Sequence, residues 1–217
     1  MELETNIKLL LGDCMDIMPE YPTDYFDLAI VDPPYGIKRF ARPLGNTDRV
    51  SIPGHPTKIN KWDIKPNAKY FAELFRVSKK QIIWGANNFD LPPTEYFIVW
   101  DKNQTVDNFA SAEYAWTNIK QPAKIFRHSI HQVIFNRKTE GGKIHPTQKP
   151  IPLYRWLLEN YATHTDKILD THLGSGSSTI AAHYFGVNEF LGIEIDQEYF
   201  NSAKNRFEKS TRQLQLI

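Results

Sequence analysis

The sequence predicts an α/β fold, in which a doubly wound and mostly parallel sheet carries helices on both faces. Several strand candidates are nearly all apolar instead of alternating, which is typical of strands covered on both sides. Segments with the apolar spacing of amphipathic helices separate these runs. A chain of 217 residues is long enough for one domain with a proper core and short for two, so residues 1–217 are expected to form a single domain.

The strand candidates are short apolar runs rich in β-branched and aromatic residues. They are 7–13, 26–32, 81–86, 96–102, 112–117, 132–136, 167–170 and 189–196. The helix candidates follow the same reasoning. One apolar face begins at Tyr70, a second at Leu153 and a last one at Tyr199, and a further helix should begin near Ser177 and stop at Gly186.

Two basic segments stand out in a chain of net charge +1. Residues 37–80 hold eleven Lys or Arg against three acids, and residues 118–149 hold seven against one. The stretches 36–66 and 118–144 have no clear period, and we interpret them as loop excursions that contact a polyanion such as duplex DNA. The side chains assigned to phosphate contact or target reading are Lys38, Arg39, Arg42, Arg49, Lys58 and Lys61.

A glycine-rich turn lies between the strand 167–170 and the helix that follows it. Gly174 and Gly176 allow a close backbone approach to a ligand, and the helix N-terminus offers unpaired N–H groups. Glu194 ends the next strand, where a carboxylate can accept hydrogen bonds from ribose hydroxyls. The unit predicts a cofactor that contains a nucleoside.

The same turn favours S-adenosylmethionine over a dinucleotide. The third glycine of the dinucleotide pattern is replaced by Thr179, and Asp170 places a carboxylate beside the loop. That carboxylate would repel a pyrophosphate and suits a cationic ligand. Since only one strand follows this unit, the other strands must come from the N-terminal part, which predicts a circularly permuted sheet.

The run "DPPY" (32–35) follows another apolar strand. Asp-Pro-Pro can simply end a strand, because proline cannot continue a ladder. However, "DPPY", then "HPTQKP" (145–150), then "DTHLGSG" (170–176) resembles, in this order, the beta group of amino-methylating DNA methyltransferases. The resemblance covers nearly the whole chain and implies a Rossmann-like methyltransferase sheet.

The resemblance also implies a site. Asp32, Pro33, Pro34 and Tyr35 match the catalytic motif, with Asp32 also beside the cofactor. The cofactor positions are matched by Asp13, Cys14, Thr147, Lys149, Asp170, Gly174, Gly176 and Glu194. Thr171, His172 and Leu173 depart from the family, which more often has Pro-Phe after the aspartate. No metal is expected.

The implied activity is methyl transfer from S-adenosylmethionine to the exocyclic amine of adenine in duplex DNA, with base flipping. Two alternatives stay open: a cytosine exocyclic-amine methyltransferase, and a non-catalytic DNA- or cofactor-binding subunit. The resemblance further implies a restriction-modification type of enzyme and a possible homodimer. No run approaches the ~20 apolar residues of a membrane span, and a single cysteine suits a cytoplasmic protein.

Overall fold

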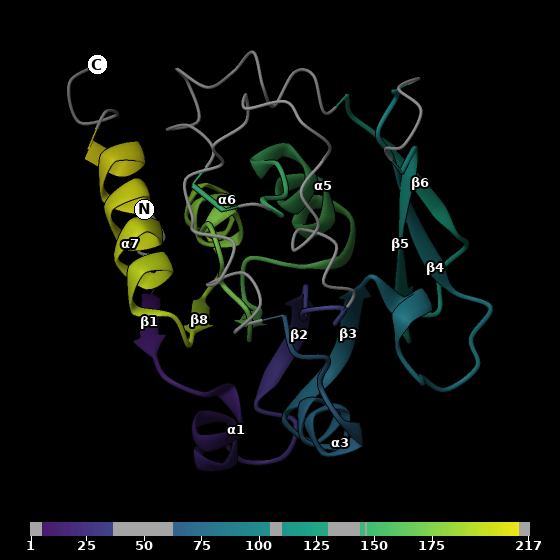
Figure 1. Cartoon of the computed structure of the whole chain (residues 1–217), viewed down its shortest axis with the longest axis horizontal. Coiled ribbons are helices and arrows are strands. Elements are labelled where there is room, and N and C mark those ends of the chain that lie inside the picture. The colour runs from purple at the N-terminus through teal and green to yellow at the C-terminus, as the bar shows by residue number, and fades with distance from the viewer. Residues whose placement is uncertain (1–5, 37–62, 105–109, 130–143, 146, 213–217) are drawn as a thin grey trace, which may run out of the picture.

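The computed structural model describes residues 6–36, 63–104, 110–129, 144–145 and 147–212. One sheet of eight strands organises these residues, in the order β1-β8-β7-β2-β3-β5-β4-β6 (Figure 1). The strands are β1 (Asn6–Leu11), β2 (Phe26–Val31), β3 (Ser78–Trp84), β4 (Phe97–Asp101), β5 (Ala112–Thr117), β6 (Lys124–Arg127), β7 (Lys167–Asp170) and β8 (Glu189–Glu194).

The five strands from β1 to β3 in this order are parallel, as the apolar runs predicted. Strand β5 then pairs antiparallel with both β3 and β4, and β6 pairs parallel with β4. The doubly wound, mostly parallel sheet and its permuted order are therefore confirmed.

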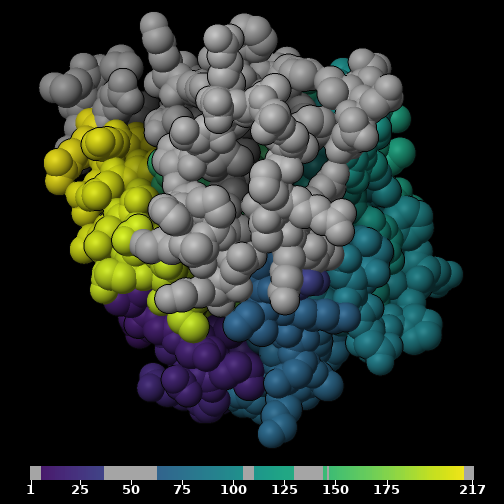
Figure 2. Space-filling model, viewed as in Figure 1, coloured from purple at the N-terminus to yellow at the C-terminus, as the bar shows by residue number. Residues whose placement is uncertain are grey.

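Helices cover both faces of this sheet (Figure 1). They are α1 (Cys14–Ile17), η1 (Met18–Glu20), α3 (Ala68–Val77), η3 (Ala86–Asn88), α5 (Ile151–Tyr161), α6 (Ser177–Phe185) and α7 (Gln197–Arg212). Helix α7 and the strands β4 to β6 lie on opposite flanks of the molecule (Figure 2). Among the described residues, none of the helices is long and apolar enough to span a membrane.

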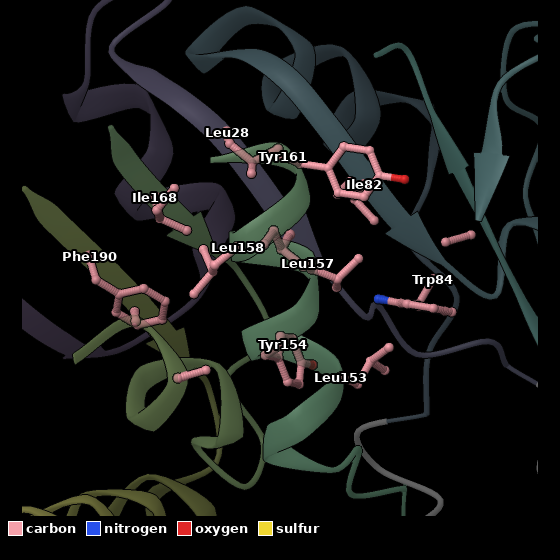
Figure 3. Close-up of a cluster of buried hydrophobic side chains, with 14 of the residues drawn as sticks. Leu28, Ile82, Trp84, Leu153, Tyr154, Leu157, Leu158, Tyr161, Ile168 and Phe190 are labelled. Carbon is pink, nitrogen blue, oxygen red and sulfur yellow. The ribbon is translucent and has the colours of Figure 1, made fainter. Parts of the chain in front are cut away.

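Two apolar clusters hold the layers together, one on each face. On the first face, α5 turns Leu153, Leu157 and Leu158 toward the sheet, where they meet buried side chains such as Leu28 of β2 and Ile168 of β7 (Figure 3). On the other face, residues of α1, η1 and α3 pack against β2 and β3. Strand β2 packs against both clusters, and Asp27 is its one residue that is not apolar.

The structure corrects two of the sequence predictions and leaves a third untested. The first strand ends at Leu11, two residues early, because the Asp13 side chain accepts a hydrogen bond from the Met15 N–H and starts α1. Residues 118–144 are not wholly a loop, since Lys124–Arg127 form β6. The strand expected at 132–136 lies outside the described residues.

Candidate active site

The candidate site lies where the winding of the sheet reverses direction. Strands β2 and β7 are parallel neighbours, and the chain continues from them toward opposite edges of the sheet. Ligands of open α/β sheets bind at such a switch point, outside the carboxyl ends of the strands. Asp32 directly follows β2 and Asp170 ends β7, so both acids lie at this point.

One pocket at this edge joins the three motifs that the sequence singled out. Its wall contains residues of the "DPPY" run, the "HPTQKP" turn and the glycine loop, together with the end of β8. It is lined by Asp32, Pro33, Pro34, Tyr35, Asp63, His145, Thr147, Gln148, Lys149, Tyr154, His172, Leu173, Gly174, Ser175, Glu194, Ile195 and Tyr199.

The Asp32 carboxylate is held by two side-chain donors. The Tyr35 hydroxyl donates to Oδ1 over 2.7 Å, and the Lys149 ammonium lies 2.5 Å from Oδ2. The Asp32 side chain is only 13% exposed, so these two contacts replace much of the hydrogen bonding that solvent would provide. Each carboxylate oxygen has a second lone-pair direction and can still accept a further donor.

Tyr35 packs inward, beside Asp32. Its ring lies against Gly85, where a Cβ atom would approach the ring to 2.1 Å, and edge-on to Phe89 at 6.0 Å between centroids. Gly85 has a φ of +66°, so glycine serves both the turn and this close contact. Burial, and next the nearby Asp32 charge, raise the pKa of Tyr35 well above its usual value. The hydroxyl is therefore a neutral donor.

The "HPTQKP" turn lies over the glycine loop. The His145 ring is close to Gly174, where an added Cβ would sit 3.7 Å from it, and it packs edge-on against Tyr199 of α7. The Thr147 hydroxyl is 3.0 Å from His145 Nδ1, which fixes the turn from within. The turn thus carries Thr147 and Lys149 to the pocket, as the sequence predicted by resemblance.

Lys149 has a second acidic partner that the sequence analysis missed. Its ammonium lies 3.1 Å from Oε2 of Glu113, a residue of β5. Burial opposes charge on Lys149, but Asp32 and Glu113 outweigh it and raise the lysine pKa. The Glu113 pKa, which burial alone would raise, is lowered to about 2 by Lys149 and Lys102. Lys149 and Glu113 therefore both carry their charge.

The glycine loop is supported from beneath by Asp170. This aspartate is 1% exposed and accepts hydrogen bonds from the Ser178 hydroxyl and the His172 N–H, at 2.5 and 3.1 Å. Burial raises its pKa to about 7, with smaller contributions from Asp32 and Glu194. Asp170 does not line the pocket. Its contacts tie the loop to the start of α6.

Two further contacts shape the same loop. Gly176, with a φ of +71°, lies so close to α7 that a Cβ atom would come within 3.1 Å of Ala203 Cβ. Arg206 of α7 is buried and donates to the Ser175 carbonyl and the Ser177 hydroxyl, each over 2.9 Å. Gly176 does not line the pocket, so it serves the packing of the loop, whereas Gly174 lines the pocket.

Glu194 faces the pocket from the end of β8 and is 8% exposed. Its Oε2 accepts the Gly174 N–H over 2.8 Å, and its Oε1 accepts the Asp196 N–H over 2.9 Å. These bonds aim the carboxylate at the loop. Burial raises the pKa of Glu194 despite them.

Asp13 and Cys14 lie beside this end of the sheet but not in the pocket wall. The Gly12 N–H donates to the Glu194 carbonyl, which places the start of α1 near β8. Cys14 is buried, and burial, then the charge of Asp13, raise the pKa of its thiol to about 12. The thiol is therefore protonated and unreactive.

Other pocket residues carried little or no signal in the sequence. His172 is kept neutral because burial lowers its pKa to about 4, and its Nδ1 lies 2.9 Å from the Thr171 hydroxyl. Asp63 accepts the Gly36 N–H over 2.7 Å. Only the departure of residues 171–173 from the family pattern marked His172, and nothing local marked Asp63 or Glu113.

The basic side chains predicted to contact DNA fall outside the described residues. They are Lys38, Arg39, Arg42, Arg49, Lys58 and Lys61. The flanking residues are described: Gly36 and Asp63 meet at the pocket, so the chain leaves and re-enters the described fold there. Within the described part of the chain, no three His, Cys, Asp or Glu side chains gather as metal ligands.

The charge of the pocket wall indicates the ligand it suits. Among the described lining residues, Asp32, Asp63 and Glu194 are acidic, and the single basic side chain, Lys149, is already ion-paired. Such a wall repels phosphate groups and favours a ligand that bears a positive charge.

Comparison with known proteins shows what this chain is similar to. Residues 112–205 match the model of the N6/N4 methyltransferase family, described as DNA methylase. Over 96% of its length the chain is 25% identical to a methylase of Escherichia coli K12 named as YubD, 93% of which is covered. Residues 112–205 are thus similar to DNA methyltransferases of the N6/N4 family, and nearly the whole chain is similar to a protein described as a methylase, in line with the motifs.

Solved structures agree on the fold. The M1.HpyAVI complex with S-adenosylmethionine superimposes with a TM-score of 0.58 at 19% identity, covering 92% of this chain and 99% of that one. The PvuII DNA methyltransferase, described as cytosine-N4-specific, gives a TM-score of 0.57 at 13% identity, covering 97% and 93%. The Rossmann-like sheet is therefore confirmed.

Proposed function

We propose that this chain is an adenine-specific DNA methyltransferase. It transfers the methyl group of S-adenosylmethionine to the exocyclic amine of an adenine in duplex DNA, after the base has been flipped out of the helix. The observation that carries the proposal is the single pocket shared by Asp32, Gly174 and Glu194 at the switch point of the sheet.

The pocket fits S-adenosylmethionine. Glu194 is aimed by two backbone N–H groups at the end of β8, where the ribose hydroxyls of a nucleoside would be bound. Gly174 presents bare backbone to the ligand, and the acidic wall suits the ligand's cationic groups. When bound, the cofactor would supply an electrophilic methyl carbon. Attack by the amine nitrogen would form the N–C bond as the C–S bond breaks with its electron pair left on sulfur, and one proton of the amine would pass to solvent.

The chain's own part is to make the amine nucleophilic. The lone pair of an exocyclic amine is delocalised into the ring, so its two protons need acceptors that reshape the nitrogen. The Asp32 carboxylate accepts a hydrogen bond from one N–H of the amine, and the Pro33 carbonyl accepts a hydrogen bond from the other. Pro34 has no N–H and offers no competing donor. A misplacement of about 1 Å can cost on the order of a hundredfold in rate, which is why a rigid pair of prolines suits this position.

Tyr35 is assigned to the target base. Stacking of a base on an aromatic ring contributes roughly 1–3 kcal/mol, which offsets part of the cost of flipping. In the described conformation the ring packs on Gly85 and Phe89. Its hydroxyl bonds to Asp32, so the base would stack beside the acceptor that binds its amine.

The test is methyl transfer from labelled S-adenosylmethionine to DNA by the wild-type chain and by Asp32→Ala. We expect activity in the wild type and at least a hundredfold loss of kcat in the variant, with cofactor binding retained in calorimetry. Full activity of Asp32→Ala would contradict the assignment. A wild type that neither binds the cofactor nor methylates DNA would favour a non-catalytic subunit.

Cytosine remains the second candidate target, because the PvuII enzyme of similar fold is described as cytosine-N4-specific. The aspartate at the start of "DPPY" favours adenine, since the cytosine group more often begins this motif with serine. Mass spectrometry of digested, methylated DNA separates the two: N6-methyladenine supports the proposal, and N4-methylcytosine replaces it.

A further inference from the structure

A chain of four charged side chains leads from the catalytic carboxylate into the sheet. Lys149 bridges Asp32 and Glu113, with N–O distances of 2.5 and 3.1 Å. Glu113 also pairs through Oε1 with Lys102, 2.5 Å away. The two acids and two lysines alternate, so the network is neutral as a whole. It joins the end of β2 to β5 and to the residue that follows β4.

The Lys149 ammonium is enclosed by this network. Its side chain is 3% exposed, and the ring of Trp84 lies 5.6 Å from the nitrogen. The Tyr35 hydroxyl is a third contact, at 3.4 Å. A buried cation of this kind is stable only while its anionic partners are present. Lys149 therefore serves the Asp32 carboxylate, although the resemblance assigned it to the cofactor.

This arrangement bears on how a base is accepted. Lys149 and Tyr35 already donate to the two oxygens of Asp32, so the target amine must share or replace one of these donors. Lys149 has a second anion within reach, and its donor can turn toward Glu113 without leaving the charge unpaired. Without Glu113, Asp32 would be its one remaining acid among the described contacts, and release would leave a buried charge uncompensated.

We propose that Glu113 is a positioning residue for methyl transfer, acting through Lys149 on the Asp32 carboxylate. Glu113 holds the ammonium in place and takes over its hydrogen bond when the amine reaches Asp32. This inference rests on the proposed function and deepens it, because it adds to the reaction a residue that contacts neither cofactor nor base.

The experiment compares Glu113→Gln with the wild type and with Glu159→Gln as a matched control. Glu159 lies on α5 in an exposed ion pair with Arg155, away from the pocket wall. The readouts are kcat, the KM for DNA, and the affinity for S-adenosylhomocysteine by calorimetry. Each kcat is normalised to the fraction of molecules that bind S-adenosylhomocysteine, so that unfolded protein does not count.

We expect Glu113→Gln to lower kcat by about tenfold to a hundredfold and to change the cofactor-product affinity by less than about twofold. Glu159→Gln should match the wild type. In a Lys149→Met background, the further change Glu113→Gln should have almost no effect on kcat, since Glu113 acts through the missing ammonium. If Lys149→Met does not fold, the test rests on Glu113→Gln alone. A lower kcat with an unchanged affinity for S-adenosylhomocysteine then supports the inference.

Two outcomes would overturn the inference: a normalised kcat of Glu113→Gln equal to that of the wild type, or a loss fully explained by weaker binding of the product. Both outcomes count only if the wild type is active. An inactive wild type would instead contradict the proposed function, so the two failures are distinguishable.

Discussion

Asp32 and Asp170 end neighbouring parallel strands at the same edge of the sheet, yet their surroundings differ. Asp32 lines the pocket and is paired with a buried lysine. Asp170 is 1% exposed and receives hydrogen bonds from a hydroxyl and a backbone N–H, both neutral donors. Burial raises the pKa of Asp170 to about 7, whereas the nearby Asp32 has a cation in contact.

The difference shows that position on the sheet does not define the role of a carboxylate. A buried acid with a cationic partner stays ionised and can act as an acceptor for a substrate. For a buried acid whose hydrogen-bond donors are neutral, the protonated form is favoured, and its hydrogen bonds stabilise the local structure. On this basis we assign the proposed acceptor role to Asp32, whereas Asp170 supports the glycine loop.

Removing the cation that distinguishes the two sites should give the largest effect on stability. Lys149→Met leaves Asp32 and Glu113 buried without their shared partner. Loss of one member of a buried ion pair typically costs about 3–5 kcal/mol of unfolding free energy. Urea denaturation measures it, with the exposed Arg155→Gln as a control expected to change less than about 1 kcal/mol. Equal losses of unfolding free energy in Lys149→Met and Arg155→Gln would contradict the importance given to the buried cation.

The second prediction concerns the pH dependence of stability at Asp170. Its pKa rises from 3.8 to about 7 on folding, so between these values the folded chain binds more protons than the unfolded chain. The contribution of Asp170 to stability is therefore fully present below about pH 4 and is lost as the pH rises through about 7. The shift corresponds to a few kcal/mol at most, at about 1.4 kcal/mol per pKa unit.

Unfolding free energies of the wild type and Asp170→Asn, measured between pH 4 and 8, test this. Since the other acids are common to both chains, the wild type should lose stability relative to the variant as the pH rises. A difference that does not depend on pH would show that Asp170 is ionised throughout.

The smallest effect is expected at Ser178, the hydroxyl donor to Asp170. Ser178→Ala leaves one oxygen of the buried carboxyl without its donor and should cost about 1–2 kcal/mol. It should also weaken binding of S-adenosylhomocysteine, because Ser178 ties the glycine loop to α6. Calorimetry measures the affinity for S-adenosylhomocysteine, and thermal melting measures the stability. A gain in affinity would contradict the supporting role of Asp170.

The sequence predicted the buried strands well and the sheet edge poorly. The runs 112–117 and 167–170 coincide with β5 and β7, because apolar and aromatic side chains there face packed layers. Strand β6 was missed, since "KIFR" is four residues long, has only two apolar residues between two charged ones, and lies at an edge of the sheet. Helix α1, four residues long, is too short to show a period.

The same contrast holds within the site. The "DPPY" run, the glycine loop and Glu194 could be located in the sequence because each lies at the carboxyl end of a strand. Glu113 could not, because a single acid in the middle of a strand resembles any solvent-facing position. Its partners Lys102 and Lys149 lie 11 and 36 positions away in the chain, and only the folded sheet brings the three charges together.

The hydrogen bond from the Gly36 N–H to Asp63 has a practical consequence for engineering. It closes the chain segment between these residues at its base, beside the pocket. The entropy of closing such a segment grows slowly, by roughly 0.6 kcal/mol for each doubling of its length. Segments of other lengths and compositions could thus be grafted between Gly36 and Asp63 at modest entropic cost, and such chimeras would test the predicted role of this segment in DNA contact.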